Sequence, residues 1–403
     1  MAVDDVIDAL SEGRDARVEL YKELHRSPEL SMAEYGTADR IEQELTRLGL
    51  EPVRIGETGV LAIIDNGEGP VVAMRADIDG LPVAEASGAD YASTATAVLD
   101  GETVPTMHAC GHDVHIVSLL GAIEALLARG DAWSGTFVAV FQPGEETAEG
   151  ARSMVAAGLV DAMPQPDVFL GQHVMPTIPL GTVAARSGPF MSAAASIRIT
   201  VHGRGTHGSM PDAGIDPIVL ASSIVLRLQT IVAREIAPSQ TAVVTVGSIR
   251  AGSKSNIIPD SATLLVNTRA FDADVAAHLH SAIERIVRAE CAASRSPKEP
   301  EIEYYDHFPL TVNDEAVTEK VRRSFDEHFG EHHVPVGAMA GSEDFSILPA
   351  AFNAPSCFWV LGGFADPATA PGNHSPAFLP ELESLDVGAR AILVASAPWL
   401  MRS

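Results

Sequence analysis

The order of apolar and polar residues predicts two patterns of secondary structure along this chain of 403 residues. Over the first fifty residues, apolar positions recur every three or four residues, which is typical of amphipathic helices. Short runs rich in valine and isoleucine follow at 59–65, 71–77, 135–142 and 167–173, and a helical pattern lies at 115–130. Apolar strands that alternate with helices indicate an α/β domain whose sheet is covered on both faces.

The pattern changes near residue 190. The predicted elements there are a strand, a helix, two strands, a helix and a strand, at 193–203, 216–233, 241–250, 261–271, 272–292 and 299–307. This β-α-β-β-α-β order is that of a ferredoxin-like α+β domain, in which two helices pack on one face of an antiparallel sheet. An inserted domain of this kind is therefore predicted at residues 189–302.

The α/β pattern resumes after the insert, with a helix at 315–329, a strand at 357–363 and a closing helix at 384–397. Residues 1–188 and 303–403 are therefore predicted to form one discontinuous α/β domain with a mixed sheet covered by helices. A length above 400 residues agrees with this arrangement, because single cores rarely grow beyond about 300 residues.

The charge balance excludes several classes of partner. The chain has 27 Lys plus Arg against 54 Asp plus Glu, a net charge of -27, which repels nucleic-acid phosphates and anionic membrane surfaces. The start of the chain is acidic, unlike a signal peptide, and apolar stretches such as SLLGAIEALLA are too short to span a membrane. Three widely spaced cysteines argue for a reducing compartment. We therefore predict a cytoplasmic protein that binds neither nucleic acid nor membranes.

The segment MHACGHDVH, residues 107–115, concentrates side chains that bind metals or act in catalysis. In an extended or turning segment, Cys110 and His112 point to the same side, so they can share zinc or another transition ion. A second hypothesis makes Cys110 a nucleophile, with His112 or His108 as its base and Asp113 orienting that base. Residues elsewhere in the chain favour the metal.

Further candidate ligands stand where the predicted strands end, and sites in α/β sheets gather at such ends. They are Asp77, Glu145, Glu146, His173 and, in a turn-rich loop, His374. Each has an ordinary structural explanation when taken singly, such as a solvated helix start or a loop cap. Their convergence favours one site. Adjacent residues of an extended chain point apart, so one of the two glutamates can bind a metal while the other faces a water molecule.

Seven motifs closely resemble the M20 metallopeptidase family, and specifically its amidohydrolase branch of aminoacylases, hippurate hydrolases and auxin-conjugate hydrolases. In chain order they are MRADIDGLP, MHACGHDVH, FQPGEETAEGARSM, GQHV, GRGTHGSMP, GSEDFS and NHSP. The resemblance covers nearly the whole chain, including the predicted insert.

The resemblance implies two divalent metal ions, with zinc, manganese, cobalt and nickel as candidates. The implied ligands are Cys110, His112, Glu146, His173 and His374. Glu145 matches the family's general base, and Asp77 matches an aspartate that orients the site from behind a metal-bound histidine. The implied reaction is hydrolysis of the amide bond of N-acyl amino acids by an activated water molecule.

The resemblance also assigns roles to the insert, as a lid and dimerisation domain. His207 matches a histidine that reaches the reaction centre of the partner subunit in a homodimer. Asn256 and Arg269 stand where the family grips the substrate's carboxylate, and an arginine suits this role because its planar fork binds a carboxylate through two hydrogen bonds. Arg269 in a structural ion pair of the sheet is an equally good explanation.

Three alternatives to an N-acyl amino acid hydrolase remain open. A dipeptidase or aminopeptidase has the same metal site and differs only in the group beside the cleaved bond. The nucleophilic thiol leaves Glu146, His173 and His374 without roles, and a chelator separates it from the metal hypothesis. A catalytically silent binding protein would lack the base or a ligand, and none is missing here.

Overall fold

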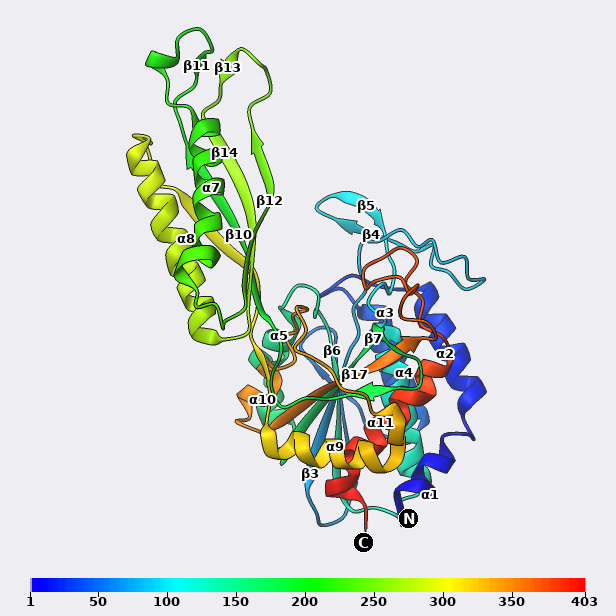
Figure 1. The fold of residues 1–403 in the computed structure, drawn as a ribbon. Helices are drawn as coiled ribbons and strands as arrows, with labels where there is room; N and C mark the ends of the chain where they lie inside the picture. Colours follow the sequence, from blue (N-terminus) through cyan, green and yellow to red (C-terminus); the bar gives the residue numbers. More distant parts are fainter. Residues whose placement is uncertain (1, 403) are drawn as a thin grey trace. The chain divides into compact units, whose positions relative to one another are not determined.

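A computed structural model describes residues 2–402, which form two compact units (Figure 1). The first unit comprises the described residues up to Phe190, Val312–Gly337 and the described residues from Asp344, and the second comprises Met191–Thr311 and Ala338–Glu343. The second unit therefore extends beyond residue 302, the predicted end of the insert. The reason is that strand β15 (Glu301–Phe308) pairs with β10 (Ala193–His202) along its length.

The first unit is built on a mixed sheet with the strand order β1-β2-β6-β3-β7-β17-β8. Strands β6, β3, β7 and β17 run parallel, whereas β2 and β8 are antiparallel to the neighbours that they pair with. The strands are β1 (Val53–Ile55), β2 (Gly59–Asn66), β3 (Val71–Asp77), β6 (Gly135–Gln142), β7 (Val168–Pro179), β8 (Val183–Ala184) and β17 (Ser356–Phe364). The central strands are buried on both faces, which explains their continuous apolar runs.

Helices and short pairings complete the first unit. The helices are α1 (Ala2–Ala9), α2 (Arg14–Arg26), α3 (Tyr35–Arg47), α4 (His112–Ala128), α5 (Gly150–Ala156), α6 (Leu159–Ala162), α9 (Glu315–Phe329), α10 (Ile347–Ala351), α11 (Glu383–Leu400) and the 3-10 turn η2 (Gly330–His332). The additional strand pairs are β4 (Thr96–Leu99) with β5 (Glu102–Pro105), and β9 (Gly188–Met191) with β16 (Thr311–Asn313). Helix α4 is buried almost all round, because it contacts β3 as well as α1, α2 and α11.

The second unit has an antiparallel sheet with the strand order β12-β14-β10-β15. Its elements in chain order are β10, β11 (Thr206–His207), η1 (Pro211–Ala213), α7 (Pro217–Glu235), β12 (Ala242–Ala251), β13 (Ile257–Ile258), β14 (Ser261–Ala270), α8 (Ala273–Ala293) and β15. The larger elements follow the predicted β-α-β-β-α-β order, which is confirmed. Helices α7 and α8 pack on the sheet around one apolar cluster that includes Ile197, Leu228, Leu264 and Ile283.

Helix α7 is long and apolar enough, by length and composition, to cross a membrane. In this unit its apolar side chains pack in the hydrophobic core. Leu220, Ile224, Leu228 and Ile231 recur on one face and are buried against the sheet and α8. Asp216 is the N-cap of the helix. Its side chain accepts hydrogen bonds from the backbone N–H groups of Ile218 and Val219, which stabilises the first turn.

Candidate active site

The residues predicted at strand ends lie along one edge of the first unit's sheet. Asp77 is the last residue of β3, and Glu145 and Glu146 follow shortly after β6 ends. His173 lies in β7, beyond the last residue of that strand that pairs with β3. The carboxyl ends of neighbouring parallel strands meet at the same edge of a sheet, so segments distant in sequence deliver these side chains to one place.

The turn that carries Cys110 and His112 depends on the glycine between them. Gly111 has a φ of 80° and immediately precedes α4, whose first residue is His112. A Cβ atom at Gly111 would lie 2.5 Å from Cγ1 of Val174 in β7. Glycine is therefore required here both by the left-handed backbone and by the close approach of β7.

The five predicted metal ligands lie together in the first unit. Ligand atoms of Cys110, His112 and His173 all lie within 4.8 Å of one another, and so do those of Cys110, Glu146 and His374. Cys110 belongs to both sets, so its sulfur stands where a ligand shared by two ions would stand. Its Sγ lies 3.4 Å from Nε2 of His173.

The polar atoms of this cluster fit a cation. Nε2 of His112 is buried and has no hydrogen-bond partner among the described residues, and Oε1 of Glu146 lies 3.9 Å from it. Buried polar atoms without partners are rare in folded proteins and are explained when an ion binds them. Thiolate, imidazole and carboxylate are together the donors of zinc and similar ions.

Hydrogen bonds orient two of the imidazoles toward the cluster. His173 donates from Nδ1 to the backbone oxygen of Val174, 2.7 Å away, which leaves Nε2, 3.4 Å from Sγ of Cys110, as the acceptor of the ring. His112 donates from Nδ1 to Oδ1 of Asp79 at 3.0 Å, which leaves its Nε2 free in the same way. In its neutral form each ring therefore presents the lone pair of Nε2 to the cluster, which is the form that binds metals.

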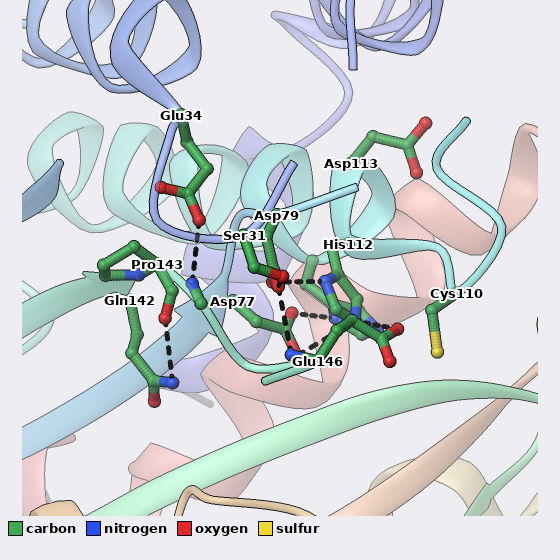
Figure 2. Close-up of polar contacts among 12 residues, drawn as sticks. Ser31, Glu34, Asp77, Asp79, Cys110, His112, Asp113, Gln142, Pro143 and Glu146 are labelled. Atoms are coloured by element: carbon green, nitrogen blue, oxygen red, sulfur yellow. Dashed lines mark hydrogen bonds and ion pairs between the residues drawn. The ribbon is translucent and has the colours of Figure 1, made fainter. Parts of the chain in front are cut away.

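Asp79 also contacts the cluster, although sequence patterns did not reveal it. In addition to the bond from His112, its Oδ2 accepts hydrogen bonds from the Ser31 hydroxyl at 2.7 Å and from the Glu146 backbone N–H at 3.0 Å (Figure 2). Burial acts to raise the pKa of Asp79, but the hydrogen bond from His112 and the other donors outweigh it, and the pKa lies below its usual value. Its signal in the sequence is the Asp77-x-Asp79 spacing, which directs two carboxylates to the same side of an extended segment.

Asp77 has different contacts from those expected of it. One oxygen pairs with Nδ1 of His115, and the other accepts a hydrogen bond from Nη1 of Arg75 at 2.8 Å. The second oxygen also lies 3.5 Å from Nε2 of His112, the nitrogen that faces the cluster. The carboxylate behind His112 is therefore Asp79, whereas Asp77 approaches the same ring from its ligand side.

Glu145 is buried beside the ligands. One of its carboxylate oxygens lies within 4.8 Å of a ring nitrogen of His112 and of a carboxylate oxygen of Glu146. The loop that carries both glutamates is held by Glu34, which accepts a hydrogen bond from the Gly144 N–H at 2.8 Å (Figure 2). Burial, together with the nearby charge of Asp79, raises the pKa of Glu34 to about 7. Glu34 is the second residue that sequence patterns did not reveal.

His374 completes the cluster from a distant loop. Its backbone N–H donates to the carbonyl of Ala109 at 2.7 Å, and its Nε2 lies 3.2 Å from Oε1 of Glu146. Hydrogen bonds with Cys110 and Glu146 raise the pKa of His374 to about 10. An environment that attracts a proton so strongly also attracts a cation, which agrees with the donor set described above.

Asp113, the neighbour of His112, faces away from the ligands. Its Oδ2 lies 2.6 Å from Nδ1 of His25, whose Nε2 lies 3.1 Å from Oε1 of Glu85. Burial acts to lower the pKa of His25, but Asp113 and Glu85 overcome it and raise the pKa to about 9. Asp113 therefore anchors the start of α4 to α2 through His25.

The candidate residues of the second unit fall into two groups. His207 and Asn256 are adjacent, because β11 pairs with β13 and the Gly208 N–H donates to the backbone oxygen of Asn256 at 2.8 Å. Arg269 lies near the far end of β14, about 26 Å from the first residue of that strand at roughly 3.3 Å per residue. Its Nη1 donates to the Ala340 carbonyl at 2.6 Å and to the Ser342 hydroxyl at 3.0 Å, so these contacts are not an ion pair.

Residues 73–395 match the model of Peptidase family M20/M25/M40. The chain belongs to this family. An N-acetyl-L-cysteine deacetylase of Bacillus subtilis is 35% identical over 385 residues, which are 95% of this chain and 87% of the relative. An IAA-amino acid hydrolase of Arabidopsis thaliana, ILR1-like 4, is 33% identical over 93% of this chain and 83% of its own length.

The fold is shared with a solved member of the M20 family. The crystal structure of the Bacillus subtilis YXEP protein, a dinuclear metal-binding peptidase, is similar with a TM-score of 0.77 and 28% identity. The similarity covers 96% of this chain and 98% of that one. Family membership and the donor cluster together show that this chain is a hydrolase of the M20 family whose donors are those of divalent metal ions.

Proposed function

We propose that the protein is a metal-dependent amidohydrolase that cleaves the amide bond of N-acyl amino acids. The observation that carries the proposal is the pair of three-residue donor sets that share Cys110 and lie beside Glu145. The substrate class is supported by two relatives that match most of the chain, one a deacetylase of N-acetyl-L-cysteine and the other an IAA-amino acid hydrolase.

The proposed cofactor is a pair of divalent ions, with zinc, manganese, cobalt and nickel as candidates. Cys110, His112 and His173 would hold one ion, and Cys110, Glu146 and His374 the other. When bound, such ions polarise a carbonyl group and lower the pKa of a water molecule from about 15.7 toward about 7. The first set, with a thiolate and two imidazoles, favours zinc or cobalt over harder ions.

Glu145 is the proposed general base. Its carboxylate takes a proton from the attacking water molecule and afterwards delivers that proton to the leaving nitrogen. Its position beside His112 and Glu146 supports this role. Asp79 fixes the ring of His112 and the backbone of Glu146 at the same time, so it holds one ligand from each donor set.

The residues proposed to select the substrate are Arg269, Asn256 and His207. Arg269 would bind the carboxylate of the amino acid, and His207 would stabilise the oxyanion that forms at the carbonyl carbon. The separation of Arg269 from the His207 and Asn256 pair within one chain supports contacts from two chains to one substrate. If His207→Ala mixed with Glu145→Gln restores no activity, this action across subunits is wrong.

We propose a homodimer formed through the second unit. Strand β12 is at the edge of its sheet, and large apolar side chains are exposed on this unit at Met210, Ile218, Val219, Leu226, Val243, Ile249 and Ile257. Exposed apolar surface and a ten-residue edge strand are both features of interfaces between copies of a chain. Leu226→Lys should lower the mass measured by sedimentation to that of one chain, with Lys298→Ala, an exposed residue before β15 at the opposite edge of the sheet, as a control that leaves it unchanged.

A cytoplasmic location is proposed from the cysteines. Cys110, Cys291 and Cys357 are all free thiols and all buried. Free thiols persist in compartments that keep them reduced. Cell fractionation with an antibody against the protein tests this location.

A dipeptidase or aminopeptidase is the second candidate, because the family and the solved YXEP protein are described as peptidases. A panel of N-acetyl amino acids, N-benzoyl amino acids and dipeptides, run with each of the four ions, separates the two. Preference for acylated substrates supports the proposal, whereas preference for free dipeptides overturns it. An amidase that used Cys110 as its nucleophile would retain its activity in the presence of a chelator. His108, one candidate base for that thiol, has no hydrogen-bond partner among the described residues.

A further inference from the structure

One histidine of the segment 107–115 is buried in the metal-binding cluster without belonging to either donor set. His115 follows His112 by three residues on α4, so the two side chains share a face of the helix. The ring of His115 stacks on that of His112 with centroids 5.6 Å apart and lies edge-on to that of His173 at 4.6 Å. Its side chain is 1% exposed.

Both ring nitrogens of His115 are engaged by protein groups. Nε2 accepts a hydrogen bond from the backbone N–H of Val174 at 2.8 Å, and Nδ1 pairs with Oδ1 of Asp77. A backbone N–H can only donate, so Nε2 carries no proton. The proton of the neutral ring must then be on Nδ1, where it is donated to Asp77. His115 therefore has no lone pair left for a metal, in contrast to His112 and His173.

The Val174 N–H needs this acceptor because of where β3 stops. Pairing between β3 and β7 ends at Arg75 and Gly171, while β7 continues to Pro179. A buried backbone N–H without a partner is strongly disfavoured. His115 occupies the position at which the neighbouring strand would have supplied a carbonyl group.

The same peptide segment also orients a proposed metal ligand. The backbone oxygen of Val174 accepts the hydrogen bond from Nδ1 of His173. Val174 is therefore held at its N–H by His115 and in turn holds the ring of His173 through its C=O. On the other side of the ring, His115 orients the carboxylate of Asp77, whose second oxygen lies 3.5 Å from Nε2 of His112.

We propose that His115 is a positioning residue that, through a single tautomer, fixes both the Asp77 carboxylate and the strand segment that carries His173. This inference rests on the proposed metal site. It means that His115 sets the distance between the ligand nitrogens of His112 and His173. It also explains the third histidine of the MHACGHDVH segment, which the ligand sets leave without a role.

The first test uses the metal-free protein and needs no activity. NMR of protein labelled with ¹⁵N at histidine distinguishes a ring protonated at Nδ1 from one protonated at Nε2, and His115→Asn identifies the signal by its loss. We expect His115 to carry its proton on Nδ1. A proton on Nε2 would overturn the inference, whatever the activity of the enzyme.

The second test measures binding of Co²⁺ by calorimetry and by its absorption spectrum. His115→Phe keeps an aromatic ring and removes both hydrogen bonds, so we expect Co²⁺ affinity to fall about 10- to 100-fold and the spectrum to change. His115→Asn restores a donor near Asp77, and His115→Gln restores an acceptor near Val174, so each should recover part of the loss. His278→Phe, on the exposed surface of α8, is the control that should change nothing.

The two proposals fail in different ways. If the wild-type protein binds Co²⁺ and His115→Phe binds it with the same affinity and spectrum, His115 has no positioning role and the proposed function stands. If the wild-type protein binds no divalent ion, the proposed function is wrong, and the Nδ1 proton still tests the tautomer.

Discussion

Replacement of Gly111 by alanine tests how the turn between Cys110 and His112 is built. Gly111 has a φ of 80°, and a non-glycine residue in this left-handed region costs about 1–2 kcal/mol. The added Cβ would also lie 2.5 Å from Val174 and 3.3 Å from Phe378, and overpacking of this kind costs about 1–3 kcal/mol. Gly111→Ala should therefore lower the free energy of unfolding by about 2–5 kcal/mol.

Gly88→Ala is the matched control. Gly88 has a φ of 81°, and nothing lies within 4 Å of the Cβ that alanine would add there. The control should therefore lose only the backbone contribution, about 1–2 kcal/mol. Urea unfolding of the metal-free variants measures both values, and calorimetry should show weaker metal binding for Gly111→Ala alone. Equal destabilisation by the two substitutions would refute the argument that the close approach of β7 requires glycine at 111.

Three further predictions concern groups around the cluster. His25 has a pKa raised to about 9 against an ordinary 6.5, so its protonation contributes about 3 kcal/mol of stability that is complete below pH 6.5 and is lost as the pH rises through 9. His25→Gln should remove this slope from unfolding curves measured between pH 6 and 10, and an unchanged slope would exclude His25 as its source. Asp79→Asn should weaken metal binding about 10- to 100-fold in calorimetry, because the bond that orients His112 loses its charge; full affinity would show that Asp79 does not act on the ligand. Glu146→Gln should lower the metal content measured by mass spectrometry, and unchanged content would remove Glu146 from the donor set.

The parts of the fold that follow local periodicity were predictable from the sequence. Strands β3, β6 and β7 are continuous apolar runs because both faces of the sheet are covered, and the order of the elements from β10 to β15 follows from the change to alternating strands. The edge strand β1 and the hairpin β4–β5 were not predicted. They are short and largely exposed, so they carry little hydrophobic pattern.

That the candidate donor residues lie close together was predictable for a different reason, namely that the carboxyl ends of parallel strands meet at one edge. The residues that hold the ligands were not. Asp79 contacts Ser31 and the Glu146 backbone, and Glu34 contacts the Gly144 N–H, so their partners come from segments whose approach is set by tertiary packing. The same holds for Arg269, whose distance from Asn256 follows from the length of β14 and leaves no trace in composition.

The central claim is that the protein hydrolyses N-acyl amino acids with Glu145 as the base, beside two ions that ligands sharing Cys110 would hold. The most direct test measures metal content and turnover of Glu145→Gln beside the wild-type protein, each before and after removal of metal. We predict two ions per chain in both proteins, turnover about 10² to 10⁴ times lower in the variant, and no turnover in the metal-free wild type. Full turnover by the metal-free protein, or by Glu145→Gln, would contradict the account.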